Sequence, residues 1–222
     1  MEKEIMVEPS EELAYWVGVA QSDGYLKRYH WKCEERVGLS FGISEKSLPM
    51  LTKFRSISDK ILHRKSKIWK CKSGWQYYVG MKSSMKLLRT LGIIISPVYL
   101  PPIWTVQEPK YFGAYLAGLI DGDGDIRVKR PKYPQCVIRI TSGLVQDFLQ
   151  KQLESSLDIK ILQTRRCGKK FIKGKFYDTR WVTLEFYVSK RVHHFLLKYV
   201  IPQMVMFYKK EKLLQFIDKN TN

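Results

Sequence analysis

The chain has 222 residues, and its 39 Lys and Arg residues outnumber 21 Asp and Glu residues to give a formal net charge of +18. With 45% hydrophobic and 13% aromatic residues, the sequence is too rich in core-forming side chains for a disordered basic tail. No apolar run approaches the roughly 20 residues of a membrane-spanning helix, and the acidic start MEKEIMVEPSEEL does not resemble a secretory signal. We therefore expect an intracellular protein that makes no use of a membrane.

The excess of positive charge predicts an acidic partner, for which nucleic acid and anionic membranes are the usual candidates. A membrane-surface protein would concentrate its charge in one amphipathic helix, whereas these cations are spread over the whole chain. The four cysteines lie far apart without a C-x-x-C pair, which argues against structural zinc. Composition therefore favours nucleic acid as the partner.

The first predicted element is a helix that recurs one hundred residues later. Residues 13–24 read LAYWVGVAQSDG and residues 113–124 read GAYLAGLIDGDG. Each copy precedes basic, alternating stretches, an amphipathic stretch, a second hairpin-like region and a closing helix, which predicts the order α-β-β-α-β-β-α twice. We expect two halves, residues 1–95 and 110–222, joined by a linker at 96–109 whose prolines interrupt any continuous helix. The predicted fold class is α+β, with two pseudo-twofold-related halves.

The predicted strands have one apolar and one basic face, as where Ile126 and Val128 alternate with Arg127 and Lys129. This pattern predicts antiparallel sheets with helices on one face. A solvated sheet face is the simple alternative for one strand, but the bias recurs in both halves. A two-stranded ribbon fits the major groove of B-DNA, which is about 12 Å wide. The expected contact residues are Lys27, Tyr29, Trp31, Arg36, Ser40, Lys46, Lys70, Lys72, Arg127, Lys129, Arg139, Thr141, Arg165, Lys170, Arg180 and Thr183.

The two repeated helices contain glycine at equivalent central positions, Gly18 and Gly118, where glycine costs about 1 kcal/mol relative to alanine. This repetition predicts that the helices pack closely against each other and bring Asp23 and Asp123 together at their ends. We expect the glycines that follow, 24 and 124, to adopt the left-handed conformation of a helix end. Paired aspartates at helix C-termini are unfavourable unless divalent cations neutralise them. Such a pair can form a phosphodiester-cleaving site.

AYLAGLIDGDG at 114–124 resembles the signature of the LAGLIDADG homing endonucleases, and AYWVGVAQSDG at 14–24 looks like a diverged first copy. The resemblance covers nearly the whole chain. It implies a single-chain, monomeric DNA endonuclease with interface helices and a saddle of two four-stranded sheets. It also implies metal binding by Asp23 and Asp123, with main-chain oxygens near Ser22 and Gly122, and cleavage across the minor groove that leaves 3′ overhangs.

The resemblance also implies further site residues. A polar residue that positions the attacking water falls on Glu45 in the first half and on Ser142 in the second, with an exposed loop residue as the even alternative. A basic residue near the site falls on Lys209, or failing it on Lys210. The first-half segment SPVYLPPIW has no lysine, which predicts unequal sites and faster nicking of one strand. Mg²⁺ is the expected cofactor, with Mn²⁺ substituting and Ca²⁺ binding without supporting cleavage.

The leading functional hypothesis is therefore a site-specific double-strand DNA endonuclease, encoded by an intron because no splicing motif is present. An intron RNA-binding maturase and a non-cleaving DNA-binding relative of the same fold remain alternatives. A basic architectural protein without sequence specificity is a third class, which the motif disfavours. The cytoplasm or nucleoid of a prokaryote, or an organelle, is the expected location.

Overall fold

The computed structural model describes residues 8–31, 34–72, 74–79, 81–129, 134–172 and 174–221, leaving out the side chains of 29–31, 34–37, 81–84, 172 and 221. The elements before the middle of the chain are α1 (Glu11–Ser22), β1 (Gly24–Trp31), β2 (Glu34–Ile43), the 3₁₀ turn η1 (Glu45–Ser47), α2 (Leu48–Ile61), β3 (Trp69–Cys71), β4 (Gly74–Val79), α3 (Met81–Thr90) and α4 (Ile103–Gln107). Those that follow are α5 (Pro109–Asp123), β5 (Gly124–Lys129), β6 (Gln135–Ser142), α6 (Asp147–Leu157), β7 (Leu162–Ile172), β8 (Lys175–Tyr187), α7 (Lys190–Phe195), the π-helical turn η2 (Leu196–Val200) and α8 (Phe207–Thr221).

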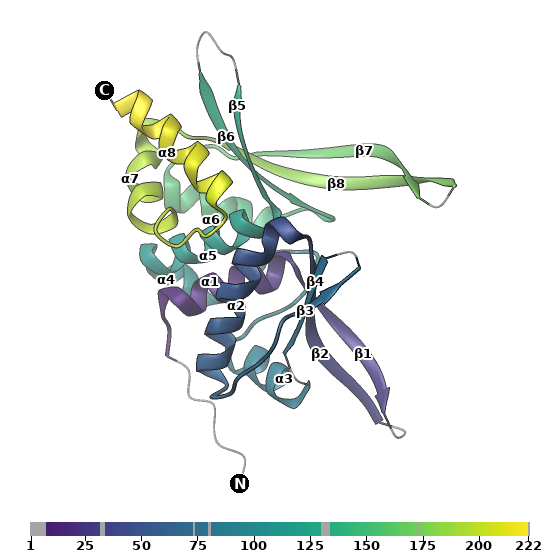
Figure 1. Ribbon diagram of the computed structural model, residues 1–222. Coiled ribbons are helices and arrows are strands. Elements are labelled where there is room, and N and C mark those ends of the chain that lie inside the picture. The colour runs from purple at the N-terminus through teal and green to yellow at the C-terminus, as the bar shows by residue number, and fades with distance from the viewer. Residues whose placement is uncertain are drawn as a thin grey trace.

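The strands form two four-stranded antiparallel sheets of matching topology, with strand orders β1-β2-β4-β3 and β5-β6-β8-β7. The helices gather on one side of the molecule and the strand hairpins project on the other, while α1 and α5 lie between the two sheets (Figure 1). This arrangement confirms the predicted α+β class and the helices on one face of each sheet. Within the described ranges, no helix is long and apolar enough to cross a bilayer.

Helix α1 forms because its start is capped and its middle is apolar. The Ser10 side chain accepts a hydrogen bond from the Leu13 amide at 3.2 Å, and two glutamates occupy the first turn, where negative charge is stabilising. Trp16 stacks on Phe54 of α2 with ring centroids 4.8 Å apart, and its indole N–H donates to the Ser58 hydroxyl at 2.8 Å. These contacts fix α2 against α1 and the first sheet.

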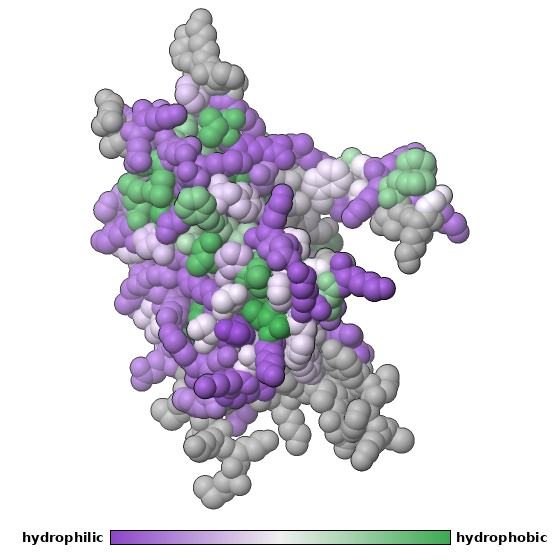
Figure 2. Space-filling model, viewed as in Figure 1, coloured by the Kyte–Doolittle hydropathy of each residue, from purple (hydrophilic) through white to green (hydrophobic). Residues whose placement is uncertain are grey.

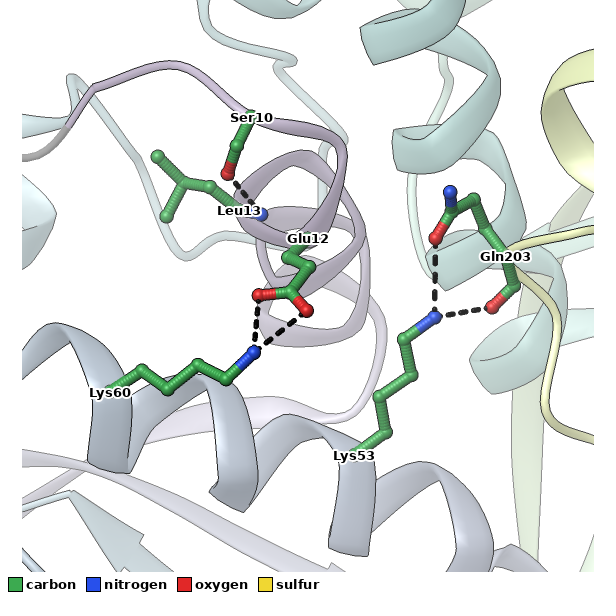
Figure 3. A network of polar contacts seen from close by, with 6 residues as sticks. All are labelled: Ser10, Glu12, Leu13, Lys53, Lys60 and Gln203. Atoms are coloured by element: carbon green, nitrogen blue, oxygen red, sulfur yellow. Dashed lines mark hydrogen bonds and ion pairs between the residues drawn. The ribbon is translucent and has the colours of Figure 1, made fainter.

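A polar network beside α1 and α2 links the first half of the chain to the second (Figure 3). The Lys53 ammonium of α2 donates to the Gln203 carbonyl, between η2 and α8, at 2.6 Å. The Gln203 amide donates in turn to Glu11 of α1 at 2.5 Å. Burial lowers the pKa of Lys53 to about 8. The network therefore joins residues 150 and 192 positions apart in the sequence beside α1 and α2.

The two sheets differ in the length of their outer hairpins. Strands β7 and β8 have 11 and 13 residues, against 3 and 6 in the equivalent β3 and β4. At about 3.3 Å per residue the β7–β8 ribbon is roughly 36 Å long, and it projects well beyond the body of the molecule (Figure 1). Its outer part exposes Lys169, Lys170 and Lys175, and near its tip lie the hydrophobic Phe171 and Phe176, 61% and 72% exposed (Figure 2). The molecule is therefore markedly asymmetric.

Candidate active site at the crossing of the two repeat helices

Helices α1 and α5 cross in contact at the two repeated glycines. A Cβ placed on Gly18 would lie 2.2 Å from the Tyr115 carbonyl oxygen, and one on Gly118 would lie 2.4 Å from the Tyr15 carbonyl oxygen. Both contacts are with backbone atoms, which cannot move aside alone. The close packing predicted for Gly18 and Gly118 is thus present, and it is possible only because neither position has a side chain.

The crossing brings the C-terminal ends of α1 and α5 together. Asp23 follows α1 directly, and Asp123 is the last residue of α5. A Cβ on Gly122 would lie 2.6 Å from Oδ2 of Asp23 and 2.1 Å from the Ser22 hydroxyl, so the Asp23 carboxylate packs against the backbone just before Asp123. The structure thus places both motif acids at one point between the sheets.

The prediction of left-handed glycines at these helix ends was wrong. Gly124 has φ −79° and ψ 147°, Gly24 has no positive φ either, and each glycine is the first residue of a strand. Glycine is needed there because a Cβ on Gly24 would lie 2.3 Å from the Ala20 carbonyl oxygen, and one on Gly124 would lie 2.4 Å from that of Ile120. At each helix end the chain turns so sharply into the strand that the first strand residue packs against the last turn of the helix.

Both carboxyl groups lie in an environment that disfavours their charge. Burial raises the pKa of Asp23, and the Lys209 charge partly offsets this. Burial likewise raises the pKa of Asp123 to about 6, where the Tyr99 hydrogen bond lowers it and the charge of Asp23 raises it. Burial therefore disfavours the charged form of both carboxyl groups, and the charge of Lys209 offsets this only in part.

Lys209 lies at this site but binds the backbone. Lys209 is 5% exposed, and its ammonium group donates to the carbonyl oxygens of Ile120, Asp121 and Gly122 at 2.7, 2.7 and 3.1 Å. These are carbonyls of the last turn of α5, where a cation is favourable. Burial lowers the pKa of Lys209, and the aspartates around it raise it. Lys209 thus caps α5 beside the acids.

Asp121 has a structural role at the helix crossing. Its carboxylate accepts hydrogen bonds from the Tyr15 hydroxyl at 2.8 Å and from the Val205 amide at 2.8 Å. The equivalent residue Gln21 accepts from the Tyr115 hydroxyl at 2.7 Å and donates to the Leu100 carbonyl at 2.8 Å. The two residues form matching clamps across the helix crossing, one built from a carboxylate and one from an amide.

Glu45 and Ser142 occupy different settings. Glu45 is exposed in η1, where it accepts a hydrogen bond from the Trp75 indole at 2.8 Å. Ser142 donates to the Leu144 carbonyl at 2.6 Å and accepts from the Gln146 amide at 2.8 Å. Ser142 also lines a cavity of about 500 Å³ that reaches Asp123 and lies between segments of both halves. Of the two residues predicted to position the attacking water, Ser142 lines the same cavity as Asp123, whereas Glu45 does not line it.

Seven of the sixteen predicted nucleic-acid contacts, all with side chains that the structure describes, lie on the sheet faces that point away from the helices. In the second sheet, the register aligns Arg139 with Glu185 and Thr141 with Thr183, and places Arg127 and Lys129 on the same face. Thr183 is 4% exposed, and the half-buried Arg139 is paired with the buried Glu185, so neither is freely available. Lys27 and Ser40 lie on the corresponding face of the first sheet, since Ser40 pairs with Tyr25 and Lys27 is two residues after Tyr25.

Three predicted contacts lie on the other side of their strands. Arg165 is paired with Val182, whose side chain faces the core, and Arg180 is two residues before Val182. Lys70 pairs with Trp75, itself paired with the buried Ile43, and its ammonium lies 5.5 Å from the Trp75 ring centroid. These three side chains are therefore not on the faces that hold Ser40 and Thr183.

The remaining predicted contacts are positioned as follows. Lys46 and Lys72 are exposed in η1 and in the turn between β3 and β4, and Lys170 is exposed on the outer part of the β7–β8 ribbon. Tyr29, Trp31 and Arg36 lie on β1 and β2, but their side chains fall outside the described residues. Their placement is therefore known only at the level of the strand.

Tyr99 is a site residue that sequence reasoning did not identify. It lies in the segment predicted as a linker, and its hydroxyl donates to Oδ2 of Asp123 at 2.6 Å. The sequence offered no reason to select this residue, because the segment SPVYLPPIW was noted for its lack of lysine and its tyrosine belongs to no motif. Contact with an acid of the other half depends on how the chain passes between the sheets.

The residues present fit a hard divalent cation. Two half-buried carboxylates supply the oxygen ligands that Mg²⁺ and Ca²⁺ prefer, and burial raises the pKa of both, which a bound cation would offset by favouring their charged forms. Among the described residues, no group of three or more His, Cys, Asp and Glu side chains forms a complete protein-only site. Mg²⁺ is commonly held by one or two carboxylates with substrate phosphates, so this partial set suits a phosphate-bearing substrate.

No family profile and no curated protein sequence matches this chain. Solved structures share its fold. A variant of I-DmoI in complex with its target DNA and manganese has 15% identity and a TM-score of 0.53 over 86% of this chain and 93% of that one. The LAGLIDADG homing endonuclease I-SmaMI bound to cleaved DNA has 13% identity and a TM-score of 0.57 over 96% and 91%.

I-GzeII, a LAGLIDADG homing endonuclease in complex with its DNA target, has 9% identity and a TM-score of 0.58 over 96% of this chain and 92% of that one. The chain has the LAGLIDADG homing endonuclease fold. The fold suggested by the motif is thereby confirmed over nearly the full length of the chain. In the LAGLIDADG fold of this chain, the two motif helices are α1 and α5, and the acids at their ends are Asp23 and Asp123.

Proposed function

We propose that the protein is a monomeric, site-specific double-strand DNA endonuclease of the homing type that hydrolyses phosphodiesters with Mg²⁺. The observation that carries the proposal is the pair Asp23 and Asp123, held at the crossing of α1 and α5 between two sheets with basic side chains. The matching of this fold to DNA-bound homing endonucleases supports the same substrate.

Asp23 and Asp123 are the proposed ligands, and the backbone near Ser22 and Gly122 offers further oxygens. When bound, a divalent cation supplies Lewis-acid activation of water and of the phosphodiester. The protein's part is to hold the two carboxylates in a fixed, half-buried position, so that little reorganisation is needed during the reaction. Lys209 contributes positive charge beside the acids while its hydrogen bonds hold the last turn of α5.

Two acids at one point suit cleavage across the narrow minor groove, where the scissile phosphates of the two strands approach each other. We propose that such cleavage leaves 3′ overhangs, that Mn²⁺ replaces Mg²⁺, and that Ca²⁺ supports binding without cleavage. The exposed cations on the sheets, such as Lys27 and Arg127, contact phosphates and neighbouring base edges. The long β7–β8 ribbon gives the second half more reach than the first.

The test is cleavage of a randomised duplex DNA library with Mg²⁺, compared with EDTA, followed by assay on the selected target. Asp23→Asn and Asp123→Asn should each abolish double-strand cleavage while changing DNA affinity by less than about tenfold, because both substitutions retain size. Asp158→Asn, an exposed acid after α6, is the matched control and should cleave normally.

Three outcomes would contradict the proposal. Loss of DNA binding in either Asn variant would assign the aspartates a structural role. Tight DNA binding without cleavage in the unmodified protein would indicate a DNA-binding relative. Preferential binding of a structured intron RNA would indicate a maturase.

A further inference from the structure

We propose that Tyr99 is a positioning residue for Asp123, and that its hydroxyl group makes the two metal-binding carboxylates unequal. The inference rests on the proposed nuclease function and names a residue that the motif does not include. It follows from the contacts of the Tyr99 hydroxyl, from the way the ring is held, and from the different surroundings of Asp23.

The Tyr99 hydroxyl lies 2.6 Å from Oδ2 of Asp123 and 3.0 Å from the Thr141 carbonyl oxygen. A phenol has one proton, so it donates to one of the two acceptors at a time. The shorter distance and the charged acceptor favour Asp123, since hydrogen bonds to carboxylates are shorter and stronger than those to neutral carbonyls. One oxygen of Asp123 is thereby engaged, which leaves Oδ1 as the oxygen free to bind a cation.

The position of this hydroxyl is fixed by its surroundings. Tyr99 is 2% exposed, and its backbone amide donates to Oε1 of Gln146 at 2.7 Å. The Gln146 amide group donates to the Pro97 carbonyl and to the Ser142 hydroxyl, both at 2.8 Å. The backbone of Tyr99 is therefore fastened to the end of β6, and the burial of its ring restricts rotation of the phenol away from Asp123.

Asp23 has no equivalent partner. In the part of the chain that the structure describes, no side chain donates a hydrogen bond to the Asp23 carboxylate. The nearby Lys209 ammonium donates instead to three backbone carbonyl oxygens at the end of α5. Asp123 is also the acid that lines the cavity between the halves, together with Tyr99 and Ser142. The two acids thus differ in hydrogen bonding and in the space they face.

This difference predicts how the two strands respond to loss of the hydroxyl. In Tyr99→Phe the ring stays but the Asp123 carboxylate is free to rotate, so a cation at that acid is held less rigidly. The strand cut that depends more on Asp123 slows at least tenfold, while the other strand slows less than threefold. Metal binding weakens in the same variant, because a carboxylate that must be ordered by the cation binds it less tightly.

The experiment compares the unmodified protein, Tyr99→Phe and Tyr115→Phe on the library-selected duplex with each strand labelled separately. Tyr115→Phe is the matched control, because it removes a buried phenol bond of 2.7 Å to Gln21 without touching either motif acid. Nicking rates are measured with Mg²⁺, and Ca²⁺ binding to the protein–DNA complex is measured by calorimetry. The expected result is a changed strand ratio and at least fivefold weaker Ca²⁺ binding in Tyr99→Phe alone.

Equal slowing of both strands, or an unchanged strand ratio with unchanged Ca²⁺ binding, would overturn the role of Tyr99. The same shift in Tyr115→Phe would also overturn it, since any loss of a buried phenol bond would then suffice. Failure of the nuclease proposal is distinguishable, because the unmodified protein would then cut neither strand. Melting temperatures of the three proteins separate a general loss of stability from the predicted strand-specific effect.

Discussion

Replacing Gly118 by alanine tests the packing on which the whole site depends. The added Cβ would lie 2.4 Å from the Tyr15 carbonyl oxygen, 2.9 Å from the Val19 nitrogen and 3.1 Å from the Gly18 Cα. All three atoms belong to the α1 backbone. Carbon atoms pack at about 3.5–4.0 Å, so α1 and α5 must separate by about 1 Å to accept the methyl group.

Two effects of opposite sign set the magnitude. Alanine is favoured over glycine within a helix by about 1 kcal/mol. Overpacking of a rigid interior typically costs about 1–3 kcal/mol, and loss of close contact along the crossing adds to this. The difference between these two effects is a loss of about 0–2 kcal/mol, and with the lost contacts along the crossing we expect Gly118→Ala to lower the free energy of unfolding by about 1–3 kcal/mol. Urea unfolding followed by circular dichroism measures it as a lower midpoint with an unchanged slope.

Gly42→Ala is the control, because a Cβ at Gly42 meets no atom within 4 Å. That variant should be as stable as the unmodified protein. The Gly118 variant should also cleave about a hundredfold more slowly, because a displacement of about 1 Å between catalytic groups has consequences of that order. Full stability and full activity in Gly118→Ala would refute the view that backbone contact at this crossing positions the acids.

Three further predictions concern the acids, the cap of α5 and the DNA interface. Since the pKa of Asp123 is raised from 3.8 to about 6, this group stabilises the metal-free protein fully below pH 3.8 and loses that contribution as pH rises through 6. The rise in melting temperature on adding Ca²⁺ should therefore be large at neutral pH and vanish near pH 5; a pH-independent rise would contradict this. Lys209→Met leaves buried carbonyls without a donor and should lower stability by about 1–3 kcal/mol in urea unfolding, whereas the exposed Lys219→Met of α8 should not. Replacing Lys169 and Lys170 together by serine should reduce the slope of log affinity against log salt by up to about 1.8, measured by fluorescence anisotropy, with an unchanged slope for Lys219→Ser. An unchanged slope in the double variant would mean that the ribbon does not contact phosphates.

The repeat was the most informative feature of the sequence, because its residues report on backbone contacts. Gly18 and Gly118 signalled a close helix crossing since a mid-helix glycine carries a cost that only a near backbone explains. The alternation of apolar and basic residues predicted the covered and uncovered faces of the sheets. It worked best near the centre of the sheets, where strands such as β6 lie directly on helices.

The same pattern was less reliable at the edges of the sheets. Val128 was expected on an apolar face but is 53% exposed, because β5 extends beyond the helices that cover its start. Arg165 and Arg180 were expected among the DNA contacts, whereas the pairing of β7 with β8 places both on the side of Val182, opposite to Thr183. Charge on a free ribbon carries no information about its face, since neither side is buried.

The sequence by itself determined the two halves, the antiparallel sheets and the identity of the acids at the helix ends. These properties are local, since they depend on periodicity, on glycine within a helix and on a repeated motif. Only the tertiary structure decided the surroundings of those acids: Tyr99 reaches Asp123 from a proline-rich segment, and Lys209 caps α5 from the last helix. Such contacts join residues up to 89 positions apart, so they depend on the path of the chain between the sheets, which no local pattern records.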